Sequence, residues 1–186
     1  MSSDQLTAFS YAVLVLVGEG GAGPHDLVQM MRRGRVYWAS SESQWYAEPK
    51  RLARLGLLRS RKEPGRTRAR TVYELTDAGR AALREWAATP VGFPRIQNEA
   101  IVRVLAADIV GDARALEGLR GLRADLDEID ASLDAAEALA AGLPHRARYL
   151  LLNHRLGRRL VAAHRAWLDE AERELGGGAE PGGAAG

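Results

Sequence analysis

Residues 57–79 read LLRSRKEPGRTRARTVYELTDAG and decide the fold. Two short segments, 57–61 and 71–75, alternate in character and are rich in β-forming residues, and the basic, turn-forming KEPGRTRAR separates them. Thr76 comes directly after the second segment and is a favoured N-cap residue, so a helix is expected over residues 77–88. The stretch therefore predicts a β-hairpin with a long basic loop, followed by a helix.

Three helices are predicted before the hairpin. Residues 6–17 are apolar almost throughout and long enough for a helix, and Pro24 suits the first turn of a second helix that reaches Arg33. A serine-rich entry at residues 39–44 begins a third helix, which ends at Gly56. The order helix, helix, helix, hairpin, helix is that of a winged helix-turn-helix, in which the hairpin forms the wing.

The rest of the chain is expected to be helical after a linker that contains Pro90. The fold class is therefore mainly α with a small β-hairpin wing: a winged helix-turn-helix domain followed by an all-helical C-terminal dimerisation domain. We place a DNA-binding domain at residues 1–90 and a helical dimerisation and effector domain at residues 91–175. Residues 176–186 hold no apolar residue larger than alanine and are expected to be a disordered tail.

A heptad pattern marks the longest predicted helix of the C-terminal domain. Its apolar residues are spaced alternately three and four apart, as in a coiled-coil seam. The seam residues are Leu119, Leu122, Leu126, Ile129, Leu133, Ala136 and Ala140. Such a seam packs either against a second subunit, which we favour and which assigns the first five residues to dimerisation, or within its own domain. A last helix is expected from about His145 to Leu175.

Composition and charge exclude several classes of protein. The 186 residues include no cysteine, so disulfides and thiolate metal sites are excluded. The apolar N-terminal run follows no basic segment and is too short to cross a bilayer, so we expect a cytoplasmic protein. Residues 31–70 carry 12 Lys and Arg against 3 acids, a local excess of 9 positive charges that suits a polyanionic partner.

The third helix divides into an inner and an outer face on a helical wheel. Trp45, Pro49, Leu52 and Gly56 share the inner stripe, and the outer face is polar and basic. Together with the wing, the outer face and its shoulders supply cations for phosphates and guanine, and hydroxyl and amide groups for base edges. The predicted DNA-binding residues are Ser41, Ser43, Gln44, Tyr46, Lys50, Arg51, Arg54, Lys62, Arg66, Arg68 and Arg70. The alternative for any one of these cations is a merely solvated surface.

The sequence resembles the PadR-like transcriptional regulators over most of its length. The matching segments are residues 11–17, residues 43–52 with 55–58, and residues 65–68 with 72–80. In the third segment the wing runs into a Y-x-L-T-x-x-G signature at the start of the following helix. Residues 164–168 are similar to the longer branch of that family. The resemblance implies a homodimer held by C-terminal helices, usually a repressor that a small, often aromatic, effector releases from an inverted-repeat operator.

Two positions depart from the pattern of that family. Pro49 lies inside the third helix, where it is expected to kink the helix or delay its start. His25-Asp26-Leu27 stands where many relatives have Gly-Tyr-x-Leu.

Other functional classes find weaker support in the sequence. Residues 18–23 match G-x-G-x-x-G, which would suit a dinucleotide-binding oxidoreductase, but no further strand follows the hairpin. His145, His154 and His164 cannot share one ligand face of a helix, so we expect no metal site. The sequence has no HExxH motif, nucleophile elbow or convincing acid/base pair, so we expect no cofactor and no enzyme. A winged helix that binds protein rather than DNA is the remaining alternative, and a mobility shift with DNA would distinguish the two.

An effector would need aromatic surface near the boundary between the domains. The candidates are Trp86, Phe93, Tyr149 and Trp167, because planar ligands stack on such rings. The alternative for these four residues is ordinary core packing.

Overall fold

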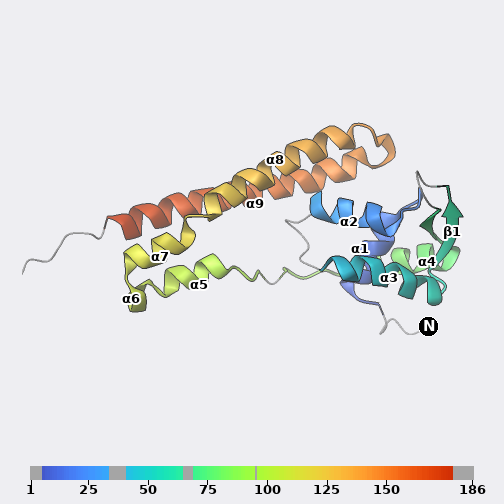
Figure 1. The fold of residues 1–186 in the computed structure, drawn as a ribbon, viewed down its shortest axis with the longest axis horizontal. Coiled ribbons are helices and arrows are strands. Elements are labelled where there is room, and N and C mark those ends of the chain that lie inside the picture. Colours follow the sequence, from blue (N-terminus) through green and yellow to red (C-terminus); the bar gives the residue numbers. More distant parts are fainter. Residues whose placement is uncertain (1–5, 34–40, 65–68, 95, 178–186) are drawn as a thin grey trace, which may run out of the picture. The chain divides into compact units, whose positions relative to one another are not determined.

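The structure, a computed structural model, describes residues 6–33, 41–64, 69–94 and 96–177 and divides into two units, Met1–Phe93 and Pro94–Gly186. The first unit holds three helices, a two-stranded antiparallel hairpin and a fourth helix (Figure 1). Its elements are α1 (Ala8–Val17), α2 (Pro24–Arg33), α3 (Glu42–Arg54), β1 (Leu58–Glu63), β2 (Arg70–Leu75) and α4 (Asp77–Ala87). The predicted winged helix-turn-helix order and the mainly α fold class are confirmed.

The hairpin register places Leu58 opposite Leu75 and Glu63 opposite Arg70. Ala22, in the connection between α1 and α2, adds an isolated antiparallel bridge to Tyr73, with N–O distances of 2.9 and 3.0 Å. Gly21 has φ +73° there, and a Cβ on it would lie 2.9 Å from the Tyr73 carbonyl oxygen. The glycine-rich run therefore brings the chain against β2.

The sheet among the described residues is a two-stranded antiparallel pair. A dinucleotide-binding fold needs parallel strands that alternate with helices, so the dinucleotide-binding alternative is wrong.

The core of the first unit lies between α1, α2, α3 and the hairpin. Leu14, Leu27, Trp45 and Leu52 are completely buried. The Phe9 ring meets the Trp45 ring edge to face, with their centroids 4.7 Å apart. Aromatic pairs favour this arrangement because the positive edge of one ring faces the negative face of the other. These contacts fix α3 with Trp45 turned inward.

The signature around Thr76 joins the hairpin to α4. The Thr76 hydroxyl donates to the Gly56 carbonyl at 2.7 Å and accepts from the Gly79 backbone N–H at 3.1 Å. Thr76 is thus the N-cap of α4, as predicted. An ideal Cβ on Gly79 would lie 2.2 Å from the Leu57 carbonyl oxygen, so only glycine allows α4 to approach the start of β1 this closely.

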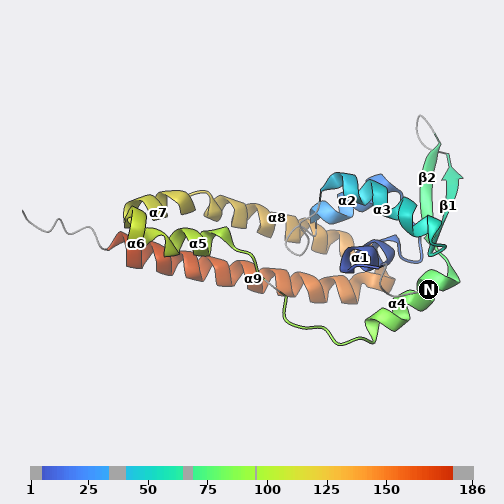
Figure 2. The same cartoon turned by 90° about the horizontal axis from the view of Figure 1, so that it is seen from below.

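The second unit is helical throughout its described elements. It contains α5 (Glu99–Leu105), α6 (Ala107–Val110), α7 (Asp112–Leu119), α8 (Leu122–Ala140) and α9 (Pro144–Gly176). In both views α8 and α9 lie side by side along most of α8 (Figure 2). With 33 residues against 19 for α8, α9 is the longest of the described helices, so the expectation that the seam helix is the longest is wrong. The predicted seam helix is interrupted at Arg120–Gly121, so Leu119 ends α7 and the remaining seam residues lie on α8.

The heptad seam is covered by α9 of the same chain. Leu126 and Leu133 form a buried cluster with Val161, while Leu119 packs with Leu168 and Ala171. Leu122 and Ile129 are partly buried beside these clusters. Packing within the domain, the alternative to a subunit contact, is thus what the structure shows. The assignment of Leu119, Leu126 and Leu133 to dimerisation is corrected, because their side chains are buried against α9 and are not available to a partner. The assignment of the partly buried Leu122 and Ile129 stays a prediction.

Ion pairs flank this helical hairpin. Arg158 on α9 contacts three acids of α8, with Nη2 at 2.5 Å from Asp134, Nε at 3.0 Å from Glu137 and Nη1 at 3.2 Å from Asp130. Hydrogen bonds to Glu137 and then to Asp134 raise the pKa of Arg158 and keep it charged. These pairs between a basic residue of α9 and acids of α8 favour the observed alignment of the two helices along each other.

Replacing Leu133 by alanine is expected to destabilise the second unit by about 2–5 kcal/mol, because the cut side chain leaves a cavity between α8 and α9. Leu133 is only 1% exposed. Urea unfolding followed by circular dichroism measures the change. Leu139→Ala on the exposed side of α8 is the matched control and is expected to stay within about 0.5 kcal/mol. Equal losses in both variants would contradict the packing described.

None of the helices in the described part of the chain is long and apolar enough to cross a membrane.

Candidate nucleic-acid interface

The outward face of α3 is polar, basic and exposed. Trp45, Pro49 and Leu52 are buried, which confirms the inner stripe expected from the helical wheel. The exposed residues of α3 and its N-cap include Ser41, Ser43, Gln44, Tyr46, Lys50 and Arg54. In the part of the chain that the structure describes, neither Lys50 nor Arg54 has a carboxylate partner within 4.0 Å. This face therefore offers two available cations beside hydroxyl and amide groups.

The helix runs through Pro49 without a delayed start. It begins at Glu42, and the Gln44 side chain accepts a hydrogen bond from the Ser41 backbone N–H at 3.3 Å. Proline lacks the N–H of an ordinary helical residue, but its ring lies on the buried side of α3. The expected late start is wrong, because contacts of the N-terminal half with the core hold that half in the helix.

Arg51 is engaged by partners within the first unit while its side chain stays 32% exposed, and its assignment to DNA stays a prediction. Its Nη2 lies 2.6 Å from Glu48 Oε1 and donates to the hydroxyl of Ser10 at 2.9 Å, and its Nε donates to Glu48 Oε2 at 2.9 Å. Ser10 on α1 is completely buried. The bidentate pair and the hydroxyl therefore fix α3 against α1. The contacts of Arg51 with Ser10 and Glu48 thereby help to set the rotation of α3 about its own axis.

Burial alone would raise the pKa of Glu48, but hydrogen bonds from Arg51 and Ser10, with the Arg51 charge, lower it below the usual 4.5. A carboxyl whose pKa is depressed by folding adds stability above its unfolded pKa and loses that stability as the pH falls through its folded pKa. The Glu48 contact is thus one source of acid sensitivity in the first unit.

Glu48→Gln is expected to lower the free energy of unfolding by about 1–3 kcal/mol at neutral pH, because Arg51 loses its charged acceptor. The variant is also expected to lose less stability than the parent as the pH falls below about 4.5. Urea unfolding of the parent and variant at neutral and acid pH measures both effects. Glu85→Gln, at an exposed position of α4, is the control. An unchanged pH dependence in Glu48→Gln would contradict the role given to this carboxyl.

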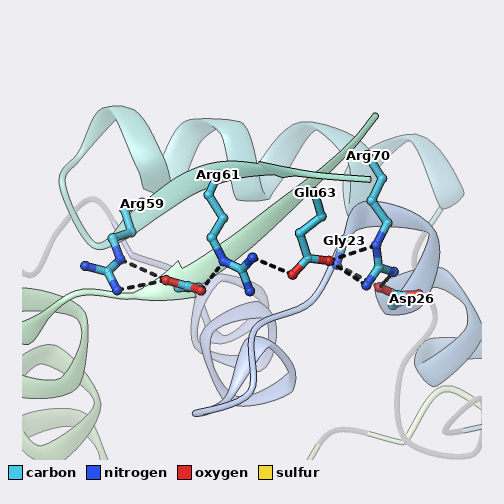
Figure 3. A network of polar contacts seen from close by, with 7 residues as sticks. Gly23, Asp26, Arg59, Arg61, Glu63 and Arg70 are labelled. Carbon is cyan, nitrogen blue, oxygen red and sulfur yellow. Dashed lines mark hydrogen bonds and ion pairs between the residues drawn. The ribbon is translucent and has the colours of Figure 1, made fainter. Parts of the chain in front are cut away.

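The strands of the wing carry along their length an ordered row of opposite charges, which we call the ion-pair ladder (Figure 3). The ladder consists of Arg59, Glu74, Arg61, Glu63, Arg70 and Asp26. Arg59 Nη2 lies 2.9 Å from Glu74, and Arg61 pairs with both Glu74 and Glu63. Hydrogen bonds from Arg61 and then Arg59 lower the pKa of Glu74. All three acids of the ladder are therefore engaged by arginines.

Arg70 closes the ladder against the first turn of α2. Its Nη2 and Nε donate to one Glu63 oxygen at 2.8 and 3.0 Å, and its Nη1 lies 3.3 Å from Asp26 Oδ2. The same Asp26 oxygen accepts from the Gly23 backbone N–H at 2.9 Å. Asp26, which stood out in the sequence as a departure, thus joins the wing to the α1–α2 connection.

The remaining predicted wing cations fall into two groups. Lys62 donates from Nζ to the Thr71 hydroxyl at 2.8 Å. Arg66 and Arg68 lie outside the described residues. The sequence did not single out Ser10, Glu48, Glu63 or Glu74. The ladder could have been predicted only with the hairpin register in hand. That register places Arg59 opposite Glu74 and Glu63 opposite Arg70, and opposite charges in such positions attract each other.

The four effector candidates belong to different surroundings. The Trp86 ring stacks on Tyr11 with centroids 4.6 Å apart and is 39% exposed, while Phe93 is almost fully exposed. Trp167 packs against the cluster of Leu119 and Leu168 in the second unit, and Tyr149 is exposed. Tyr149 and Trp167 lie 18 residues apart on α9, roughly 27 Å along a continuous helix, so one chain does not bring these two together in one pocket.

His164 makes two local polar contacts in the second unit. His164 Nδ1 lies 2.8 Å from the Leu160 carbonyl oxygen, and its Nε2 lies 3.3 Å from the amide nitrogen of Asn98, the N-cap of α5. Burial lowers the pKa of His154 although Glu137 opposes the shift. No group of three His, Asp or Glu side chains in the described ranges is arranged to hold a metal ion.

Comparison with known proteins agrees with this geometry. Residues 13–85 match the model of the Transcriptional regulator PadR-like family. Bacillus subtilis PadR in complex with operator DNA is 20% identical, with 92% of this chain and 97% of that chain covered and a TM-score of 0.72. The Vibrio cholerae virulence activator AphA is 27% identical, with 91% and 99% covered and a TM-score of 0.62.

A third similar structure is Bacillus subtilis PadR in complex with p-coumaric acid. It is 20% identical, with 89% of this chain and 99% of that chain covered and a TM-score of 0.58. No curated protein sequence matches the chain. The fold and the exposed basic helix define a winged-helix protein. Its winged-helix unit belongs to the PadR-like family of transcriptional regulators, which confirms the resemblance found in the sequence.

Proposed function

We propose that this protein is a dimeric, cytoplasmic transcriptional regulator that binds an inverted-repeat operator through the outer face of α3 and the wing. The observation that carries the proposal is the exposed set on α3, in which Lys50 and Arg54 lie beside Ser43 and Gln44. Cations on such a face contact phosphates and guanine, while hydroxyl and amide groups reach base edges in the major groove. The protein acts as a binding protein and not as an enzyme.

The first unit, Met1–Phe93, is the DNA-binding domain in this proposal, and the second provides dimerisation. Because α9 covers the heptad seam, the partner subunit meets other residues of the second unit. The exposed large apolar residues of α5, α6 and α9 are the available set, and leaving them in water is unfavourable. They include Ile101, Val102, Leu105, Ile109, Val110, Tyr149, Leu152 and Leu156. Two winged units related by a two-fold axis fit the two halves of an inverted repeat.

Regulation by a small planar effector is the second part of the proposal. Crystal structures of Bacillus subtilis PadR, which has a similar fold, have been determined in complex with operator DNA and in complex with p-coumaric acid. Here Trp86 stacks on Tyr11 and remains partly exposed, so it is the aromatic candidate with a preformed stacking surface. Binding of an effector would release the operator, which makes the protein a repressor.

Selection from a pool of random duplexes tests the proposed function. The wild-type protein is expected to enrich one inverted repeat, and Ser43→Ala is expected to alter the preferred bases while circular dichroism shows an intact fold. Sedimentation of the same sample is expected to show a dimer. Enrichment of no duplex would overturn DNA recognition and favour a winged helix that binds protein. Tight DNA binding by a monomer would overturn the dimeric part alone.

A further inference from the structure

The cations of the first unit fall into two populations that the sequence does not separate. The three arginines of the ion-pair ladder, Arg59, Arg61 and Arg70, face three carboxylates at its rungs, so the ladder carries no net charge. In contrast, Lys50 and Arg54 have no carboxylate partner within the described ranges. The local excess of positive charge counted over residues 31–70 is therefore not all available to a polyanion.

We propose that Asp26 and Glu63 act as internal substitutes for phosphate and hold Arg70, at the loop end of the wing strands, away from the DNA backbone. This inference rests on the proposed function. It assigns Asp26 and Glu63 as positioning residues that limit sequence-independent binding. It also leaves discrimination to α3, because a wing with fewer phosphate contacts adds less affinity to every sequence alike.

The geometry of Arg70 gives the physical reason. Three of its nitrogens are directed at carboxylates: Nε and Nη2 at Glu63, and Nη1 at Asp26. An arginine contacts phosphate through the same N–H groups, so a phosphate competes with both acids for one set of donors. The carboxylates also repel an approaching phosphate.

The two acids are themselves held in place. The Asp26 oxygen that faces Arg70 also accepts from the Gly23 backbone N–H, and Asp26 lies in the first turn of α2. Glu63 also binds Arg61 at 2.5 Å, and Arg61 in turn binds Glu74. If Arg70 left the ladder, Asp26 would therefore stay behind with one partner fewer. A single exposed ion pair contributes little to stability, but several charges connected in a network hold one another in place more firmly.

A double-mutant cycle in DNA binding tests the inference. Arg70→Gln is made in the wild type and in the Asp26→Asn, Glu63→Gln background, where asparagine can still accept from Gly23. The affinity for a short labelled duplex without selected sequence is measured by fluorescence anisotropy between about 50 and about 200 mM salt. In a log–log plot of affinity against salt, one phosphate contact contributes about one unit of slope.

We expect Arg70→Gln to change the slope by less than about half a unit in the wild type. In the neutralised background the same change is expected to make the salt dependence flatter by about one unit. The neutralised background alone is expected to show a slope about one unit steeper than the wild type. Asp77→Asn with Glu85→Gln removes two acids of α4 and is the charge-matched control. In this control background Arg70→Gln is expected to change the slope as little as it does in the wild type.

Equal effects of Arg70→Gln in the wild type and the neutralised background, in a protein that binds DNA, would overturn this inference and leave the proposed function intact. Failure of every variant and of the wild type to bind the duplex would overturn the proposed function and this inference with it. Thermal unfolding checks each variant. If the neutralised pair does not fold, Glu63→Gln alone replaces it, since this change removes the negative charge of the group that accepts two of the three hydrogen bonds of Arg70.

Discussion

Gly79→Ala is expected to destabilise the winged-helix unit by at least about 3 kcal/mol, the upper end of ordinary overpacking. The new Cβ would lie 2.2 Å from the Leu57 carbonyl oxygen, and this neighbour is backbone that cannot rotate away. The clash also moves the N-terminus of α4, where Thr76 caps the helix and binds the carbonyls of Gly56 and Leu57. Such a loss is a large part of the stability of a small domain.

Gly20→Ala is the matched control for that change. Nothing lies within 4 Å of a Cβ at Gly20, so its effect is expected to stay within about 0.5 kcal/mol. Urea unfolding followed by tryptophan fluorescence measures both variants, because Trp45 is buried in this unit. A Gly79→Ala protein as stable as the parent would contradict the close approach of α4 to β1.

Lys50→Glu with Arg54→Glu is expected to weaken DNA binding about a hundredfold or more, because two phosphate or guanine contacts become repulsive. Both side chains are exposed, so the fold is expected to persist. A salt titration by fluorescence anisotropy measures the loss. It is expected to show a flatter salt dependence, since fewer counterions are released.

Arg84→Glu with Arg114→Glu is the charge-matched control. These exposed arginines lie on α4 and α7, so reversing them changes the net charge equally without touching α3. The control is expected to weaken binding by less than about tenfold, through long-range repulsion alone. Equal losses in the two double variants would show that net charge, and not the outer face of α3, governs binding.

Local signals in the sequence were sufficient for most of the first unit. Thr76 marks the start of α4 because its hydroxyl caps the helix, and Gly56 marks the end of α3 because its φ is positive. The hairpin follows from alternation and turn residues. The wheel of α3 placed Trp45 correctly because burial of a helix follows its own period. Each of these features depends on residues close together in the chain.

Features that depend on a distant partner could not be assigned from the sequence. The side on which Arg51 lies was decided by Ser10, which comes from α1, and by the pairing with Glu48. The same holds for the seam residue Leu133: spacing identifies an apolar stripe, but it does not say whether α9 or another subunit covers the stripe. The ion-pair ladder likewise required the hairpin register and the position of Asp26.

The central claim is that α3 enters the major groove of DNA on both halves of a repeat. Dimethyl sulfate protection on a selected duplex tests it most directly, because the reagent methylates guanine N7, which lies in the major groove. We expect two protected patches on one face of the duplex, separated by about one helical turn or a multiple of it, and both lost in Lys50→Glu with Arg54→Glu. Binding that leaves every guanine N7 reactive, or protection that persists in the double variant, would contradict the claim.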